Sequence, residues 1–384
     1  MYYFDNAATT FPKPENVINA VSRCMRTYCG NPGRSSHRLS RAASEKIFEC
    51  RTLLAEMFGS GLPENVVFTY NATYALNIAI KALCAKNSHA IISNTEHNSV
   101  YRPVSVLSGR GDLSFDVFDA FSTNTEDVMN SIRRLRRRDT KTIIVSHASN
   151  ICGVCLPLYE IGRYCAENGI VFIVDASQSA GSHSIDMRRC NIDALCAPSH
   201  KGLMGPQGGG FVIFGDKYDD VSGLLTFAEG GNGINSFDSA MPDFLPERFE
   251  AGTLATPVIA GLCEGVKTVS NVGTDAILAH QKALKKRFTD RLANTPNITV
   301  YAPEFTDGGI VLFNIVGVPA YEAAETLDRY GVCVRSGFHC SPLAHEKLET
   351  GENGALRASF SMFNTESEVD KVFNIIRTAF GLKR

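Results

Sequence analysis

The sequence has almost no net charge, no long apolar run and no dense cysteine framework. Its 384 residues include 38 Lys and Arg against 40 Asp and Glu, for a formal net charge of −2. Proteins that bind nucleic acids usually carry an excess of positive charge, so we expect no nucleic-acid partner. The one basic run, RRLRRRD at 133–139, is more typical of the solvated end of a helix than of a binding surface.

No segment approaches the length of a membrane-spanning helix, and we expect no membrane partner. The first residues, MYYFDNAATT, have neither the basic lead nor the apolar stretch of a secretory signal peptide, which favours a cytoplasmic protein. The 12 cysteines are scattered, unlike the disulfide framework of a small secreted domain. We expect free thiols, most of them buried as small apolar side chains.

The chain is 44% hydrophobic and 20% charged, as expected for a globular protein with one large core and a smaller one. Short apolar runs alternate with helical patterns at 37–58, 73–86 and 158–168. This alternation predicts an α/β fold with a mainly parallel sheet covered on both faces, which binds ligands beyond the carboxyl ends of its strands. The runs are NVVFTY at 65, HAIIS at 89, KTIIVSHA at 141, GIVFIVDA at 169, IDALCA at 192 and GGFVIF at 209.

The second half of the sequence predicts a change of organisation. Residues 215–257 are rich in Gly and Pro and poor in periodicity, which indicates a long functional loop. A long helical pattern follows at about 257–293, then the strands ITVYAP and GIVLFNIV and a final helix near 366–380. We expect a large domain at 16–257 and a small α+β domain formed by 1–15 and 258–384.

Two polar residues follow apolar runs and point to one cofactor. Lys201 lies in PSHKGLMGPQGGG, before a glycine-rich turn that lacks the Gly-Lys-Ser/Thr order of a nucleotide-binding P-loop. A lysine at a strand end can form a Schiff base, although this stretch alone favours a surface loop lysine. Asp175 ends the run VFIV, where a carboxylate needs a cationic partner. Pyridoxal phosphate (PLP) requires both a lysine and an acid beside its ring nitrogen.

Nine segments, in order, resemble those of the class V aminotransferase family of fold-type I PLP enzymes, and within it the cysteine desulfurases. The resemblance implies a large domain with a mainly parallel seven-stranded sheet covered by helices, a small α+β C-terminal domain, PLP as cofactor and a homodimer with shared active sites. The segments are YFDNAATTFPKP, NPGRSSHRLS, TEHNSVYRP, SHASNICG, VDASQSAG, SHKGLMGPQGGG, RFEAGTLATP, RSGFHCSP and LRASFSMFNT.

The resemblance assigns five residues to the cofactor ring. Lys201 resembles the lysine that holds PLP as a Schiff base, and Asp175 resembles the partner of the ring nitrogen. Gln178 resembles the side chain that bonds the phenolic oxygen. His97 resembles the histidine that lies over the ring, and Asn150 resembles a further polar contact to cofactor or substrate.

The cofactor phosphate is assigned to a helix N-terminus and a few side chains. A helix starting near Thr73 offers unpaired N–H groups to an anion, although Thr73 also suits a plain N-cap. Ala72 stands where some relatives have a second threonine. Ser199 and His200 resemble further phosphate ligands. Thr253 resembles a threonine that reaches the phosphate of the neighbouring subunit.

Two arginines and a cysteine resemble residues that bind or attack the substrate in this family. Arg357 resembles the arginine that binds the substrate carboxylate, with Arg335 in support, although either could belong to a surface ion pair. Cys340 lies in the polar turn RSGFHCSP beside His339 and Arg335, a setting that favours thiolate. Phe338 stands where many relatives have histidine. The segment after Cys340 is short, as in relatives whose cysteine lies on a compact loop that sulfur acceptors must approach.

These assignments predict a PLP-dependent cysteine desulfurase that converts L-cysteine to L-alanine. Lys201 acts as base at the substrate Cα, Cys340 attacks the sulfur, and the persulfide passes to an acceptor protein or small thiol. A selenocysteine lyase acting on L-selenocysteine, or a transaminase, epimerase or cysteine lyase of the same fold, is the alternative. A thiol-rich metal carrier is an alternative of another class, based on the Cys152 and Cys155 pair. No second pair completes a metal site, so we expect no metal.

Overall fold

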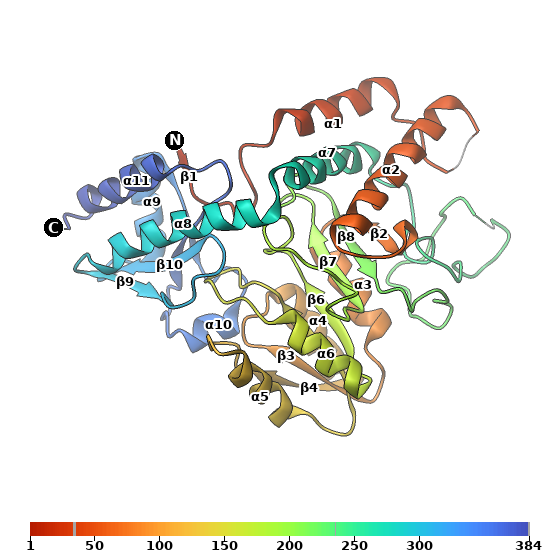
Figure 1. The fold of residues 1–384 in the computed structure, drawn as a ribbon, viewed down its shortest axis with the longest axis horizontal. Coiled ribbons are helices and arrows are strands. Elements are labelled where there is room, and N and C mark those ends of the chain that lie inside the picture. Colours follow the sequence, from red (N-terminus) through yellow and green to blue (C-terminus); the bar gives the residue numbers. More distant parts are fainter. Residues whose placement is uncertain (34–35, 235, 383–384) are drawn as a thin grey trace.

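The computed structural model describes residues 1–33, 36–234 and 236–382, and two residues of the segment NPGRSSHRLS, 34 and 35, lie outside them. A seven-stranded sheet forms the larger part, in the order β2-β8-β7-β6-β5-β3-β4 (Figure 1). Neighbouring strands from β7 to β4 are parallel, and β8 is antiparallel to both β7 and β2. The mainly parallel sheet predicted from the sequence is therefore confirmed. The strands are β2 (Val66–Thr69), β3 (Ser88–Ser93), β4 (Leu113–Phe118), β5 (Thr140–Ser146), β6 (Val171–Asp175), β7 (Ala194–Pro198) and β8 (Gly210–Phe214).

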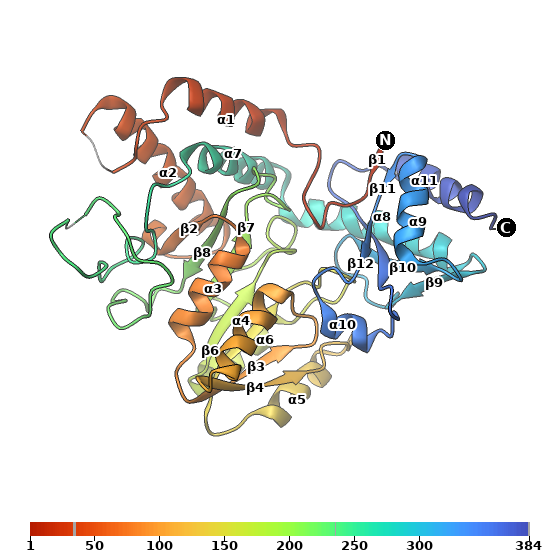
Figure 2. The same ribbon diagram turned by 180° about the vertical axis from the view of Figure 1, so that it is seen from behind.

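Helices cover both faces of this sheet because the strand residues alternate between two apolar cores. Ile143 and Val145 of β5 belong to one core, whereas Ile144 belongs to the other. The first core includes side chains of α2 (Arg38–Met57), α5 (Thr125–Leu135), α6 (Leu158–Asn168) and α7 (Thr256–Val272). The second includes α3 (Ala72–Leu83) and α4 (Asn98–Gly109), seen in front of the sheet in Figure 2. The helix α1 (Glu15–Thr27) packs on α7, and a short 3-10 helix, η1 (Pro63–Asn65), precedes β2.

A smaller antiparallel sheet, in the order β12-β13-β10-β9, forms the second part. The N-terminal strand β1 (Tyr2–Tyr3) pairs with β11 (Val332–Cys333), and the N-terminus lies beside the C-terminal elements (Figure 1). The strands are β9 (Ile298–Tyr301), β10 (Ile310–Ile315), β12 (Arg335–Gly337) and β13 (Ala355–Ser359). The helices are α8 (Thr274–Ala293), α9 (Ala320–Arg329), α10 (Pro342–Lys347) and α11 (Glu366–Ala379).

The structure corrects the predicted long helix at 257–293. The helix breaks at Gly273, which has φ 89° and separates α7 from α8. The helix α7 packs on α1 and α2 and contributes to the core of the large sheet, whereas α8 packs on β9, β10 and α11. We therefore propose a domain boundary at Gly273, in place of the boundary expected at 257.

Three strand ends define the edge of the large sheet that faces the small one. The parallel strands β5, β6 and β7 end at Ser146, Asp175 and Pro198. The carboxyl ends of parallel strands meet at one edge, where α/β sheets bind their ligands. No helix in the described part of the chain is both long and apolar enough to span a bilayer.

Candidate active site

A cavity of about 230 Å³ lies at this edge, between the ends of β5–β7 and the small sheet. It brings together side chains from distant parts of the sequence, most of which were predicted to bind cofactor or substrate. The predicted residues that line it are Ala72, Thr73, His97, Asn150, Asp175, Gln178, His200, Lys201, Arg335 and Arg357.

Lys201 follows β7 and reaches the cavity from its turn. Its main-chain carbonyl accepts a hydrogen bond from Thr10 Oγ1 at 2.8 Å, so the N-terminal arm fixes the turn. Burial lowers the pKa of the Lys201 amine to about 8, and the charge of Asp175 only partly opposes this effect. The neutral, nucleophilic fraction of this amine near neutral pH is therefore much larger than that of an ordinary lysine.

Asp175 places a buried carboxylate in the same cavity. Its Oδ1 accepts a hydrogen bond from the Ser177 N–H at 2.8 Å, and the residue is 4% exposed. Within residues 1–33, 36–234 and 236–382, no lysine, arginine or histidine lies within ion-pair distance of Asp175. Because an unpaired buried carboxylate is costly, the cavity favours a ligand that brings a positive charge to Asp175. Gln178, from the next turn, donates through Nε2 to the Ala7 carbonyl at 3.0 Å.

His97 presents a neutral, flat ring to the cavity. It is the N-cap of α4, and its Nδ1 accepts a hydrogen bond from the Ser99 N–H at 3.0 Å. Burial lowers the pKa of His97 to about 4, against the opposing charge of Asp175. Ser99 Oγ also lies 2.8 Å from Thr73 Oγ1, so the starts of α3 and α4 are joined at the cavity wall.

The N-terminus of α3 lines the cavity through Ala72 and Thr73, and the first N–H groups of a helix have no partner within that helix. Asn71 is the N-cap, since its side chain accepts from the Tyr74 N–H at 3.0 Å, so the alternative that Thr73 caps this helix is wrong. His200 lies on the same cavity, and burial lowers its pKa to about 4. Its Nδ1 is buried and has no hydrogen-bond partner among the described residues. An anion at this end would accept from the helix N–H groups, and from His200 Nδ1 in the tautomer that carries the proton there.

Arg357 lies in β13 and is 1% exposed. Its Nη2 forms an ion pair with Asp5 at 3.0 Å, and its Nη1 donates to the Asn150 carbonyl at 2.9 Å. Its buried Nε has no partner within the described part of the chain. Burial lowers the pKa of Arg357, and Asp5 opposes this shift. Arg335 pairs with Arg357 across β12 and β13, so two arginines face one cavity.

Cys340 lies in the turn between β12 and α10. The residue is half-buried, and its carbonyl accepts from the Asn98 N–H at 2.7 Å. The thiol is not among the groups that line the cavity, but its neighbour His339 is. Burial lowers the pKa of His339 well below its usual range, so the ring is neutral. Arg357 interacts electrostatically with Cys340, whereas the neutral His339 contributes no positive charge.

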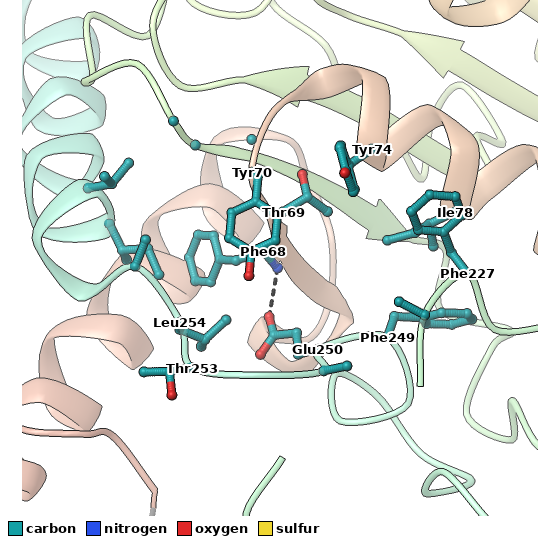
Figure 3. A pocket seen from close by; sticks show the side chains of 18 of the residues that line it. Phe68, Thr69, Tyr70, Tyr74, Ile78, Phe227, Phe249, Glu250, Thr253 and Leu254 are labelled. Atoms are coloured by element: carbon teal, nitrogen blue, oxygen red, sulfur yellow. Dashed lines mark hydrogen bonds between the residues drawn. The ribbon is translucent and has the colours of Figure 1, made fainter. Parts of the chain in front are cut away.

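Two predicted phosphate ligands lie outside this cavity. The Ser199 hydroxyl is fully buried and donates to the Pro206 carbonyl, so the structure does not bring it to the cavity. Thr253 is exposed and lines a different pocket of about 80 Å³ (Figure 3). That pocket is walled by aromatic rings, among which Tyr74 and Phe227 meet edge to face with centroids 5.3 Å apart.

The thiols of the CGVC pair are partly or fully buried. Cys152 is buried and Cys155 is half-buried, and burial raises the pKa of both thiols, that of Cys155 to about 12. In the described residues, one group has metal-ligating geometry, formed by Glu49, Cys263 and Glu264. Lys46 and Lys267 already neutralise its carboxylates, at 2.6 Å from Glu49. This group is part of an ion-pair network between α2 and α7.

The family pattern described as Aminotransferase class-V matches residues 2–372. The chain belongs to the class-V aminotransferase family. A probable cysteine desulfurase of Pyrococcus abyssi is 31% identical over 382 residues, which cover 97% of this chain and 93% of that protein. A cysteine desulfurase of Haloferax volcanii is also 31% identical, over 99% of this chain and 89% of that protein.

Solved structures agree with this membership of the class-V aminotransferases. The apo structure of a cysteine desulfurase from Thermococcus onnurineus has a TM-score of 0.89 and 29% identity, covering 99% of this chain and 94% of that one. The cysteine desulfurase CsdA of Escherichia coli has a TM-score of 0.87 at 22% identity, which supports the fold alone. The resemblance stated from nine sequence segments is therefore confirmed at the level of family and fold.

The sequence did not indicate several residues of this class-V aminotransferase site. Ser99 and Ser177 line the cavity and fix His97 and Asp175, and each lies two residues after its partner. This spacing, a polar side chain followed by serine at a helix or turn start, is the signal that could have identified them. The role of Ser341 as a contact of Asn150 carries no local sequence signal.

Proposed function

We propose that this protein is a PLP-dependent cysteine desulfurase that converts L-cysteine to L-alanine and forms a persulfide on Cys340. One observation carries the proposal: the Lys201 amine with its lowered pKa and the unpaired, buried Asp175 carboxylate line one cavity. That cavity lies at the strand ends of a class-V aminotransferase. The relatives named cysteine desulfurase support the choice of reaction.

The residues present fit the cofactor. Lys201 would hold it covalently, Asp175 would pair with its ring nitrogen, and Gln178 and His97 would contact the ring. The N-terminus of α3 at Thr73 and the unpartnered Nδ1 of His200 would bind its phosphate. When bound, PLP stabilises negative charge at the Cα of an amino-acid substrate by drawing electrons toward its ring.

The protein's own residues would bind the substrate and move its proton. Arg357, with its unpartnered Nε, and Arg335 would bind the α-carboxylate and orient the substrate in the cavity. The Lys201 amine would take the proton from the substrate Cα and return it later, a role that its lowered pKa favours. The buried walls would exclude water from this proton transfer.

The Cys340 thiolate would attack the sulfur of L-cysteine. A sulfur–sulfur bond forms as the carbon–sulfur bond breaks, and the electron pair of the broken bond stays with the substrate carbon, which gains a proton to give L-alanine. The outer sulfur of the Cys340 persulfide then passes by thiol exchange to an acceptor protein or small thiol. The compact turn between β12 and α10 supports an acceptor that approaches the site.

We also propose a homodimer, in which Thr253 of each subunit reaches the cofactor phosphate of its partner. The exposed position of Thr253 in an aromatic-lined pocket, away from the cavity of its own chain, supports this arrangement (Figure 3). The cytoplasmic location expected from the sequence is part of the same proposal.

Product analysis of the PLP-loaded protein with L-cysteine tests the function. We expect equal amounts of L-alanine and protein persulfide in a single turnover, with the persulfide mapped to Cys340. Cys340→Ser should abolish both products from L-cysteine, and Lys201→Ala should abolish the reaction. Cys29→Ser, which changes an exposed cysteine elsewhere, is the matched control. Full alanine release by Cys340→Ser would refute the proposed mechanism, and L-selenocysteine as the only substrate would favour the lyase alternative.

A further inference from the structure

The turn that carries Cys340 has a backbone conformation that needs support. His339 has φ 51° and Cys340 has φ 60°, so two consecutive residues with Cβ atoms adopt the left-handed region. This region is unfavourable for such residues and persists only where surrounding contacts impose it. The position of the thiol therefore depends on what holds this turn.

Asn150 holds the turn on both sides of Cys340. Its Nδ2 donates to the His339 carbonyl at 2.7 Å, and its Oδ1 accepts from Ser341 Oγ at 2.6 Å. Asn150 is 7% exposed and Ser341 is fully buried, so water does not compete freely for these bonds. One amide group thus joins the residues immediately before and after Cys340.

Asn150 is itself tied to the carboxylate-binding arginine. Its main-chain carbonyl accepts the hydrogen bond from Arg357 Nη1 at 2.9 Å. Asn150 and Arg357 both line the cavity. A single residue therefore connects the group proposed to bind the substrate carboxylate with the turn that carries the nucleophile.

Histidine side chains support the same turn from its other face. His339 Nδ1 lies 3.1 Å from His345 Nε2, and His345 Nδ1 lies 2.8 Å from Thr350 Oγ1. The two histidine rings stack, with centroids 5.3 Å apart and an angle of 17° between their planes. These contacts lie on the α10 side. On the side of the large sheet, the Asn98 N–H donates to the Cys340 carbonyl at 2.7 Å, and the Asn150 amide adds two side-chain bonds to the residues that flank Cys340.

We propose that Asn150 is the positioning residue of Cys340: its amide fixes the turn so that the thiol meets the sulfur of a substrate held by Arg357. The proposal rests on the proposed function and refines it. It differs from the role predicted from the sequence, a direct contact to cofactor or substrate. The two roles differ in what Asn150→Ala changes, since proton exchange at the substrate Cα needs cofactor and carboxylate contacts but not Cys340.

The experiment uses PLP-loaded wild-type protein and the variants Asn150→Ala, Asn150→Asp and Ser341→Ala. Alkylation of Cys340 by iodoacetamide without substrate, followed by peptide mass spectrometry, measures how accessible the turn leaves the Cys340 thiol. Exchange of the Cα proton of L-alanine in deuterium oxide measures proton transfer by Lys201 and carboxylate binding by Arg357. Desulfuration of L-cysteine reports the whole reaction. Asn168→Ala, a change of a helix asparagine that bonds to Tyr164, is the control.

Asn150→Ala should lower the kcat of desulfuration by about 100-fold, because a displacement of about 1 Å at a reacting atom has an effect of this size. Alkylation of Cys340 should become faster, since the released turn exposes a half-buried thiol. The exchange of L-alanine and the affinity for PLP should change by less than about threefold. Ser341→Ala removes one bond of the amide and should shift desulfuration and alkylation in the same directions by smaller factors. Asn150→Asp keeps the acceptor for Ser341 but sets a carboxylate oxygen against the His339 carbonyl, so it should shift both in the same directions as Asn150→Ala.

Unchanged alkylation together with slower L-alanine exchange would overturn the proposal and restore the direct-contact role. If Asn150→Ala does not fold, Ser341→Ala decides, because wild-type alkylation and desulfuration rates in that variant would also overturn it. Failure of the proposed function gives a separate signature: wild-type protein fully alkylated at Cys340 would retain desulfuration activity. Whether or not the proposed function is correct, the alkylation rates test whether Asn150 fixes the turn that carries Cys340.

Discussion

The carboxyl group of Glu96 accepts two hydrogen bonds from Ser146, one from the main-chain N–H and one from the hydroxyl, each at 2.8 Å. Glu96 precedes His97, and Ser146 pairs with Asp175 across β5 and β6. Glu96 thereby fixes the histidine segment to the strand beside Asp175, the carboxylate proposed to bind the cofactor. Burial raises the pKa of Glu96 to about 7, the serine hydrogen bonds oppose this shift, and the charge of Asp175 adds to it.

The pH dependence of the free energy of unfolding should reveal the raised pKa of Glu96. Because its folded-state pKa is raised from 4.5 to about 7, the folded protein binds more protons in this window, and its stability falls as the pH rises through it. Glu96→Gln removes this loss, which amounts to something on the order of 3 kcal/mol. Urea unfolding of both proteins at pH values below and above the window measures the difference. Free energies of unfolding that change in parallel with pH would contradict the assignment.

Cofactor uptake should follow the neutral fraction of Lys201. Since burial lowers the pKa of this amine to about 8, the rate of PLP uptake by the apo-protein should rise with pH and level off above about pH 8. An ordinary lysine would keep gaining neutral amine up to about pH 10.4. The growth of the absorption band of bound PLP, followed across this range, measures the rate. A rate that still rises steeply above about pH 9 would show that the amine is not tuned.

Arg357→Lys should impair substrate binding more than turnover. Lysine keeps the charge but loses the planar fork that can bind a carboxylate while contacting Asp5 and Asn150, so KM for L-cysteine should rise about 30-fold. Steady-state kinetics measure KM and kcat separately. Arg133→Lys, in an exposed ion pair with Glu126, is the matched control. An unchanged KM would remove Arg357 from the carboxylate site.

Gly210→Ala should weaken the phosphate end of the site. A Cβ at Gly210 would lie 2.5 Å from the Asn71 carbonyl carbon and 2.8 Å from the Ala72 nitrogen, so the start of α3 must shift. Because that helix start is proposed to bind the phosphate, the affinity for PLP should fall about tenfold or more. Fluorescence titration of the apo-protein measures this affinity. Gly109→Ala, where no atom lies within 4 Å, should bind PLP like the wild type.

The central strands could be predicted because burial on both faces leaves a continuous apolar run. Such runs are found at Val171–Asp175 and Ala194–Pro198, where nearly every residue is buried. The edge strand β4, Leu113–Phe118, was missed because only its two end residues are buried and it contains a charged aspartate. The break at Gly273 was missed because both flanking helices keep apolar periodicity, and only the packing of α7 and α8 on different sheets separates them.

The site could be predicted where a polar residue ends an apolar run. Asp175 and Lys201 follow this rule, and the cavity contains both. The contacts of Asn150 could not be predicted, because they join residues 189 and 191 positions apart in the sequence. The same holds for the buried Ser199 hydroxyl, whose partner Pro206 is set by the path of the glycine-rich turn. Such contacts depend on tertiary packing and not on local pattern.

Reduction of the PLP-loaded protein with borohydride, followed by peptide mass spectrometry, tests the central claim most directly. The account predicts one pyridoxyl phosphate group per chain, attached to the Nζ of Lys201, and loss of that group in Lys201→Ala. Attachment to another lysine, or no attachment at all, would contradict it.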